Sequence, residues 1–377
     1  IMKSSSKSPI LEGKIRMSDT LRYPVQDLND YIVRFFTRLG VSPTDAQTAA
    51  RVILAADLRG VDSHGIIRLH SYYGSRLLNG TINPQTAIKV LRETPVTLAL
   101  DGGNSLGQVV GEYAMSRCIE KARANAIGMV TVRCSNHYGI AGYYAMMALE
   151  HNLIGVSFTN SQPLVAPTYG RSRLLGTNPI AVAVPAGRHL PYVLDMATSI
   201  VPIGRIAVYE KMGQPVPMGW GLDEKGVATS DPHAIQNGGA LFPLGGPAET
   251  RGYKGYGLSL LVDLFCGVLA GAAIGPEVGD PSNQIPGANV GHFFAAIDIS
   301  AFRDTQEFQQ EMDRYIEFLK NAPKAVGEER IYIHGEKEFE MAEVNQREGI
   351  PLLPAVVDSL REAGALVGEP FDLQPLS

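Results

Sequence analysis

Two short polar segments carry histidines in positions that suit proton transfer. The first is D-S-H-G at residues 62–65, in the gap between two expected helices, with Arg68 one turn into the second of them. From that position the guanidinium can reach back toward the gap, and its planar fork matches a carboxylate. The second is S-N-H-Y-G at residues 135–139, which follows an expected strand and opens a helix. His137 therefore stands at the carboxyl end of that strand.

These residue types fit the oxidation of a 2-hydroxy acid. That reaction needs a base for the hydroxyl proton, a cation for the carboxylate, and donors that hold a nicotinamide cofactor. Either His64 or His137 can serve as the base, because an imidazole pKa of about 6.5 lies close to neutral pH. Arg68 follows His64 by one helical turn, so both side chains can face one cleft, with Ser63 beside them.

Each of these features also has a purely structural interpretation. Ser63 could cap the following helix, which would leave His64 as a satisfied polar side chain. Arg68 could form a salt bridge with a neighbouring acid such as Asp62. The segment at 135–139 could be an N-cap turn that contains an incidental histidine.

The usual dinucleotide-binding fingerprint is missing. The glycine clusters at 102–107 and 252–257 lack the G-x-G-x-x-G spacing, and no acidic residue about 20 positions further on completes either one. We therefore expect no standard Rossmann domain. Candidate cofactor contacts are instead the polar turns G-T-N-P at 176–179 and D-M-A-T-S at 195–199, and Lys254, which lies among glycines before a long apolar run.

The bulk composition argues against several classes of protein. The 377 residues are 45% hydrophobic, which is ordinary for a globular chain with room for two or three domains. A net charge of -5 gives no basic field, so nucleic acid is not an expected partner. The three cysteines form no motif and fit a reducing, cytoplasmic compartment. No metal site is expected, because the eight histidines and the cysteines lack ligand spacing.

Hydrophobic spacing predicts a helical beginning, an α/β middle and a helical tail from residue 305. Helices are expected over residues 24–39, 43–59, 66–78, 109–125, 141–151 and 258–272. Strands are expected over residues 87–91, 96–100, 128–132, 154–158, 180–184, 192–194 and 292–299. The stretch 213–246 is rich in Gly and Pro and should be mostly loop. We interpret the apolar run at 258–275 as a buried helix and expect no membrane span, because Asp263 interrupts a run of barely sufficient length.

Taken in order, five motifs resemble one known family. D-S-H-G-x-x-R, S-N-H-Y-G, G-T-N-P, L-D-M-A-T-S and K-G-Y-G-L are similar to motifs of the malate/L-lactate dehydrogenase family of type 2, over about residues 25–365. This family includes malate, sulfolactate and ureidoglycolate dehydrogenases, and reductases of cyclic imino acids and of diketogulonate. The resemblance implies an α/β, α+β-like fold that binds NAD(P) without a Rossmann domain. It also implies a largely antiparallel mixed sheet, a helical domain from both chain ends, and a homodimer that completes the active site.

The resemblance also assigns roles to residues. His137 and His64 would be the catalytic histidines, with Ser63 beside His64 and Arg68 on the small-molecule substrate. The implied cofactor site is lined by Ser161, Asp195, Met196, Ala197, Lys254, His334, Gly335 and Glu336. NAD is the expected cofactor, with NADP as the alternative.

The substrate class is the point on which members of this family differ. The imino-acid reductases carry an acid ten positions after the aspartate of D-M-A-T-S, where this chain has Arg205. We therefore expect a hydroxy acid such as malate. The rival interpretations are a reductase of cyclic imino acids on the same scaffold and a non-catalytic dinucleotide-binding protein.

These expectations divide the chain into three parts. Residues 1–20 form a flexible lead. Residues 21–95 form a helical N-terminal domain, which the C-terminal residues 305–377 join. Residues 96–304 form the region that binds the cofactor and makes the dimer.

Overall fold

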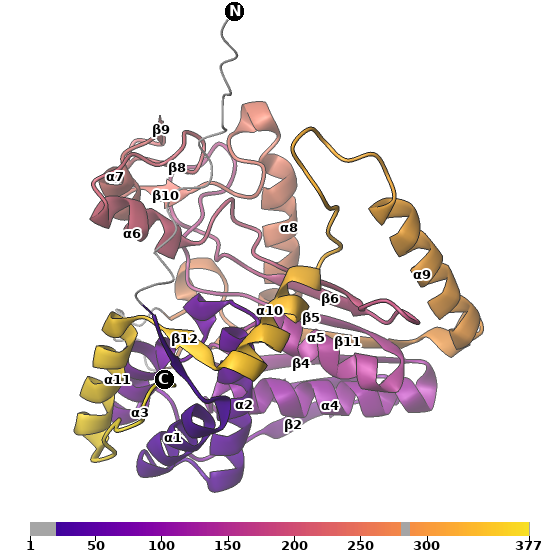
Figure 1. Cartoon of the computed structure of the whole chain (residues 1–377), viewed down its shortest axis with the longest axis horizontal. Helices are drawn as coiled ribbons and strands as arrows, with labels where there is room; N and C mark the ends of the chain where they lie inside the picture. Colours follow the sequence, from indigo (N-terminus) through magenta and orange to yellow (C-terminus); the bar gives the residue numbers. More distant parts are fainter. Residues whose placement is uncertain (1–19, 280–286, 377) are drawn as a thin grey trace, which may run out of the picture.

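The centre of the computed structural model is a seven-stranded sheet (Figure 1). The structure describes residues 20–279 and 287–376, so all of the predicted flexible lead except Thr20 lies outside the described residues. The strands run in the spatial order β2 (Lys89–Glu93), β3 (Thr97–Asp101), β4 (Ile127–Ser135), β11 (Val290–Asp298), β5 (Leu153–Thr159), β6 (Ile180–Val184) and β7 (Tyr192–Met196). Only the β3–β4 pairing is parallel. The predicted largely antiparallel mixed sheet is confirmed.

Helices cover both faces of this sheet. On one face lie α4 (Gly107–Asn125) and α5 (Ala141–Met147), and on the other lies α8 (Tyr253–Asp263), which continues as a π-helical segment over Leu264–Leu269. The central strand β11 shows how the layers form, because its side chains alternate between the faces. Phe294 packs toward α4 and α5, whereas its neighbour Phe293 packs toward α8.

A helical layer at one end of the sheet combines the two ends of the described chain (Figure 1). It contains α1 (Val25–Arg38), α2 (Pro43–Leu58), α3 (Ser75–Leu78) and α11 (Pro354–Val367). The short strands β1 (Leu21–Tyr23) and β12 (Ile350–Leu352) pair antiparallel beside them. Helix α10 (Glu336–Glu348) packs on α2, where the Asn345 side chain donates hydrogen bonds to the last carbonyls of that helix. Although β2 falls within residues 21–95, it pairs with β3 in the central sheet.

Two further parts lie outside these layers. Helix α6 (Ile203–Lys211), helix α7 (Pro232–Gln236) and the two-residue strands β8 (Gly221–Leu222), β9 (Ala228–Thr229) and β10 (Ala240–Leu241) pack around a small apolar core of their own. Most of residues 213–246 is loop, as predicted, whereas α6 was not predicted. Helix α9 (Thr305–Lys320) lies at the far edge of the molecule from that part (Figure 1).

Two predicted helices differ in the structure. The one expected over residues 66–78 is a turn, then a π-helical segment at Leu69–Gly74, then the single α-turn of α3. The one expected at 258–272 begins earlier, at Tyr253, and our interpretation of it as buried is wrong. One side packs on the sheet, while leucines on the opposite side are exposed to solvent. Within the described ranges, none of the helices is long and apolar enough to cross a membrane.

Candidate active site

The D-S-H-G loop is held by a buried carboxylate that sequence reasoning did not identify. Asp57, near the end of α2, is 3% exposed, and its Oδ2 accepts a hydrogen bond from the Ile66 backbone N–H at 2.8 Å. Burial holds the pKa of this carboxyl well above its usual range, against the lowering effect of that hydrogen bond. The loop can approach so closely because residue 65 is glycine, where an added Cβ would lie 1.9 Å from Asp57 Oδ1. Asp57 therefore positions His64 through the backbone.

Gly65→Ala is therefore expected to displace this loop. Overpacking of this kind destabilises a protein by roughly 1–3 kcal/mol, so the melting temperature should fall, and turnover should fall further because His64 moves. The matched control is Gly204→Ala in α6, where an added Cβ meets nothing within 4 Å. Thermal unfolding and steady-state rates of both variants check this. Equal behaviour of the two alanine variants would contradict the role of Gly65.

Arg68 is held by the backbone and not by an acid. Its Nε donates to the Ser63 carbonyl at 2.7 Å, and it has no ion pair within the described part of the chain. The alternative salt bridge with Asp62 is therefore not formed. Ser63 does not cap the following helix either, since its hydroxyl lies 2.9 Å from His64 Nδ1. The terminal nitrogens of Arg68 thus remain available to an anion beside the histidine.

His137 is held from behind by a buried tyrosine. The Tyr73 hydroxyl lies 2.7 Å from His137 Nδ1, and the Gly139 backbone N–H donates to the same nitrogen at 3.3 Å. Tyr73 belongs to the π-helical segment at Leu69–Gly74 and is fully buried. The other ring nitrogen, Nε2, makes no hydrogen bond with any described residue. The chain therefore fixes the ring and leaves one nitrogen for a ligand.

The structure brings the two predicted catalytic histidines together. The rings of His64 and His137 stack with their centroids 5.4 Å apart, although the two residues lie 73 positions apart along the chain. Burial lowers the pKa of His64 to about 4, and the nearby charge of Arg68 adds to the effect. Burial also holds the pKa of His137 well below its usual range, with contributions from His64 and Arg68. Both imidazoles are therefore neutral at pH 7 and able to accept a proton.

A stack of buried rings supports the S-N-H-Y-G loop. Tyr138 lies parallel to His292 of β11 at 4.5 Å and also stacks on Tyr144 of α5. The two nitrogens of His292 meet the hydroxyls of Thr159 and Ser135, each at 2.8 Å. Burial lowers the pKa of His292 to about 3, so this ring is a neutral support of the loop. Sequence reasoning did not identify it.

The segments predicted to contact a cofactor are joined by hydrogen bonds around the end of β7. The Asp195 carboxylate accepts from the Gly142 N–H of α5 at 2.7 Å, next to the His137 loop. Thr198 donates its backbone N–H to the Thr177 carbonyl, and the Thr177 N–H donates to the Ser161 hydroxyl at 3.0 Å. The D-M-A-T-S turn, the G-T-N-P turn and Ser161 thus form one continuous surface, which includes Met196 at the end of β7 and Ala197 directly after it.

Lys254 adjoins that surface. The Leu244 N–H donates to the Thr198 carbonyl, and Gly255 packs on the Leu244 backbone so closely that a Cβ there would lie 2.1 Å from its oxygen. Lys254 lies directly before Gly255, and its exposed side chain makes no hydrogen bond or ion pair with the described residues. It is therefore an unpaired cation beside the polar turns.

The late turn at 334–336 reaches the same strand through its backbone. The Val193 N–H of β7 donates to the His334 carbonyl at 3.0 Å, and Gly335 begins α10 with a φ of +94°. The Glu336 carboxylate points elsewhere: it is buried, pairs with Lys320 and with Arg330, and accepts from the Ile333 N–H. His334 is exposed, so the turn offers its backbone and one imidazole.

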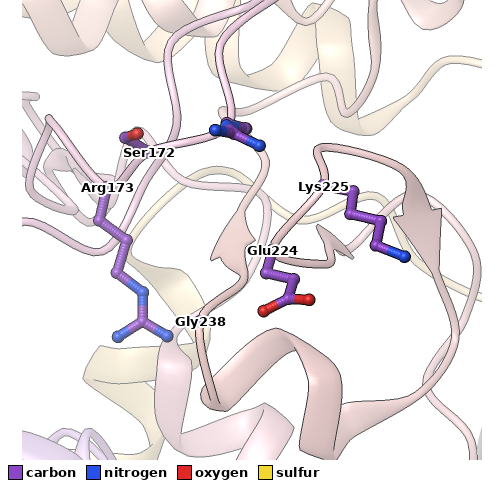
Figure 2. A pocket seen from close by; sticks show the side chains of 6 residues that line it. Ser172, Arg173, Glu224, Lys225 and Gly238 are labelled. Atoms are coloured by element: carbon purple, nitrogen blue, oxygen red, sulfur yellow. The ribbon is translucent and has the colours of Figure 1, made fainter.

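A surface hollow of about 750 Å³ lies apart from these residues (Figure 2). It is lined by Arg171, Ser172, Arg173, Glu224, Lys225 and Gly238. None of the predicted site residues lines it. Within the described ranges, no group of acidic, histidine and cysteine side chains is arranged to hold a metal ion.

Comparison with known proteins gives a consistent set of relatives. The sequence profile for malate/L-lactate dehydrogenase matches residues 23–361. A malate dehydrogenase of Pyrococcus abyssi is 48% identical, over 92% of this chain and 95% of that protein. An L-sulfolactate dehydrogenase of Methanocaldococcus jannaschii is 37% identical, over 88% of this chain and 93% of that protein. The solved structure of a malate dehydrogenase from Pyrococcus horikoshii OT3 superposes with a TM-score of 0.85 at 44% identity, covering 95% of this chain and 97% of that one.

Proposed function

The chain belongs to the malate/L-lactate dehydrogenase family, and on that premise we propose that it oxidises a 2-hydroxy acid to the 2-oxo acid with a nicotinamide dinucleotide. Malate or a similar hydroxycarboxylate is the proposed substrate. One observation carries the proposal: among residues 20–279 and 287–376, Arg68 has no acidic partner, and it stands beside two stacked, neutral histidines. A cation next to a proton acceptor is the combination that a 2-hydroxy carboxylate requires.

Arg68 and the two histidines would each have a separate role in the reaction. The fork of Arg68 would bind the carboxylate and orient the neighbouring carbon. His64, whose Nδ1–H can donate to the Ser63 hydroxyl, would take the substrate's hydroxyl proton at its unprotonated Nε2. His137 accepts from the Gly139 N–H at Nδ1, so its Nε2–H would donate to the substrate oxygen. The bound cofactor supplies the nicotinamide C4 that accepts the hydride.

The polar surface around β7 suits a dinucleotide. Asp195 has a carboxylate oxygen that can accept from a ribose hydroxyl, Ser161 has a hydroxyl, and Lys254 is a cation without a partner in the described part of the chain. We propose NAD as the cofactor, with NADP as the alternative, held by these residues and by Met196, Ala197 and the turn at 334–336.

Lys254→Met is therefore expected to weaken cofactor binding. Removal of the ammonium leaves a phosphate or ribose without its charged donor, which typically lowers affinity by about tenfold or more. Fluorescence titration with NADH measures this directly, and Lys225→Met, at the surface hollow of Figure 2, is the matched control. An unchanged NADH affinity would remove Lys254 from the site.

A substrate panel tests the proposed function. Malate, sulfolactate, lactate and the cyclic imino acid piperideine-2-carboxylate, each assayed with NAD(H) and NADP(H) by absorbance, separate the candidate activities. We expect turnover with hydroxy acids and not with the imine, because Arg205 stands where the reductases have an acid. Cofactor binding without turnover of any substrate would mean that the chain is a non-catalytic dinucleotide-binding protein.

We also propose that the chain forms a homodimer through the outer face of α8. Six apolar residues of this helix and its continuation are 37% to 62% exposed: Leu258, Leu260, Leu261, Leu264, Val268 and Leu269. A contiguous apolar patch on a folded chain marks an interface. The three free cysteines, Cys118, Cys134 and Cys266, fit the proposed cytoplasmic location.

Charged substitutions on this face should separate the subunits. The wild type is expected to have about twice the mass of one 40.6 kDa chain by light scattering. Leu261→Glu combined with Leu264→Glu should shift it to the mass of one chain, because two buried, unpaired charges per subunit oppose association. Phe318→Glu, on the exposed side of α9, is the control and should leave the dimer intact. A fully active wild-type monomer would exclude this interface.

A further inference from the structure

Arg76 in α3 is a buried cation for which the described part of the chain provides no hydrogen-bond or ion-pair partner. Its side chain is part of a residue only 5% exposed, and its Nε is enclosed without any hydrogen bond. The guanidinium forms no hydrogen bond or ion pair with the described residues; its one contact of note is with the face of the Tyr72 ring, at 4.5 Å. Buried arginines are normally paired, because an unpaired charge away from water is costly. Within residues 20–279 and 287–376, no acid balances this charge.

Arg76 lies on the side of the helical segment that faces the histidines. The Tyr72 ring beneath its guanidinium is 5.2 Å from the His137 ring, and the Tyr73 hydroxyl contacts the same histidine. Arg68 precedes the π-helical segment at Leu69–Gly74 and Arg76 follows it. Since a π turn brings residues five apart into line and an α turn those four apart, Arg68, the tyrosines and Arg76 share one side.

The electrostatics of the site agree with this placement. After burial, the positive charges of Arg68 and Arg76 both help to lower the pKa of His137, as do the neighbouring imidazoles of His64 and His292. Two arginines therefore act on one imidazole from the same helical segment. No carboxylate of the described chain balances either of them.

A second polar group nearby is also unsatisfied. Gln108, in the first turn of α4, is fully buried beside Tyr73, yet neither its amide nitrogen nor its oxygen has a hydrogen bond of good geometry. A buried amide without partners costs roughly 1–3 kcal/mol. A buried arginine and a buried amide beside the site thus both lack partners among the residues that the structure describes.

We propose that Arg76 determines specificity by binding a second anionic group of the substrate, remote from the 2-hydroxy carboxylate held by Arg68. This inference rests on the proposed function and deepens it. The favoured substrates are 2-hydroxy acids that carry a further carboxylate or sulfonate, and the Gln108 amide provides a neutral donor near the same group. Monoanionic 2-hydroxy acids leave the guanidinium buried and without a partner from the described part of the chain.

The test compares two substrates that differ at the remote end only. Malate carries a second carboxylate, and 2-hydroxybutyrate has a methyl group in its place. Arg76→Gln is expected to lower the ratio of kcat/KM for malate over that for 2-hydroxybutyrate by roughly 30-fold or more, as when one member of a buried charge pair is removed. The value for 2-hydroxybutyrate should change by less than about threefold. Arg92→Gln, on the exposed strand β2, is the control and should leave the ratio unchanged.

A binding measurement that needs no turnover accompanies the kinetics. Succinate and butyrate differ in charge at the same remote end, so with saturating NADH succinate should raise the melting temperature of the wild type more than butyrate does. Arg76→Gln should abolish the difference between the two acids. Arg76→Lys keeps the positive charge but loses the planar guanidinium fork. It should lower the ratio of kcat/KM for malate over that for 2-hydroxybutyrate by a smaller factor, about five- to tenfold, and it replaces the glutamine variant in the test if that variant does not fold.

The outcomes separate this inference from the proposed function. Equal losses on both substrates, or a lower melting temperature with an unchanged ratio, would make Arg76 a structural support for Tyr72 and overturn the inference. Oxidation of neither substrate by the wild type would overturn the proposed function. A succinate effect that persists in both Arg76 variants would overturn the inference whatever the enzyme oxidises.

Discussion

His64→Ala is expected to lower the turnover number by roughly 10²- to 10⁴-fold, the range that a positioned acid–base group contributes. His64 is the better base of the two histidines, because its Nδ1–H can donate to the Ser63 hydroxyl and leave Nε2 free to accept a proton. The Gly139 N–H donates to Nδ1 of His137, so that neutral ring carries its proton on Nε2. His137→Ala should mainly raise the apparent KM, since that ring only orients the substrate oxygen.

The pH dependence provides an independent measurement on the same residue. A base works in its neutral form, and the lowered pKa values of His137 and His64 keep both rings neutral at pH 7. Oxidation should therefore retain its kcat/KM as the pH falls below about 6.5, the ordinary histidine pKa, and decline only as it passes through the lowered value. Ser63→Ala should move this acidic limb, because it removes the hydroxyl beside Nδ1 of His64. Near-normal turnover in both alanine variants would place the proton step elsewhere.

Arg68→Lys is expected to lower kcat/KM for 2-hydroxy acids by about 30-fold, or about 2 kcal/mol. Lysine keeps the positive charge but cannot donate two parallel hydrogen bonds to a carboxylate. The anchor from Arg68 Nε to the Ser63 carbonyl at 2.7 Å is also lost, so the remaining charge is less well placed. NADH binding should stay near normal, because the proposed cofactor contacts lie around β7.

The melting temperature distinguishes this role from a structural one. Arg68 has no acidic partner in the described chain, so its replacement removes no ion pair, and the melting temperature should stay within a few degrees of the wild type. Arg51→Lys is a suitable control for a structural role, because Arg51 does form an ion pair, with Glu112 at 2.6 Å. Normal kinetics with a lowered melting temperature for Arg68→Lys would overturn its assignment to the substrate.

Elements with strong local signals were predictable from the sequence. Helix α2 begins where Ser42 and Pro43 predict it, and the Ser42 hydroxyl accepts from the Asp45 N–H. Strand β6 has the predicted bounds, Ile180–Val184. Helix α6 was missed because it buries only Ile206, too little to produce a helical stripe. The exposure of α8 was missed because the apolar residues of a helix that is apolar on every side do not indicate which side faces solvent.

The candidate site was predictable to the extent that its residues lie in compact motifs. The pairing of His64 with His137 followed from motif order, and the ring distance agrees with it. Asp57, Tyr73 and His292 were not found, because each acts on a loop from a different, buried element. Periodicity also cannot distinguish a π turn from an α turn, and the side of the helix on which Arg76 lies depends on that difference.

The pairing of β1 with β12 sets an order in which the protein can be made. Tyr23 is aligned with Ile350, the Tyr31 hydroxyl donates to the Leu360 carbonyl, and Asn345 closes the end of α2 just before the His64 loop. During synthesis from the N-terminus, the helices on either side of His64 therefore wait for partners that lie 288 to 329 positions further along the chain. Contacts between such distant parts form slowly. The central sheet can thus assemble before these contacts form, and the two histidines meet only after residues 345–360 have been made.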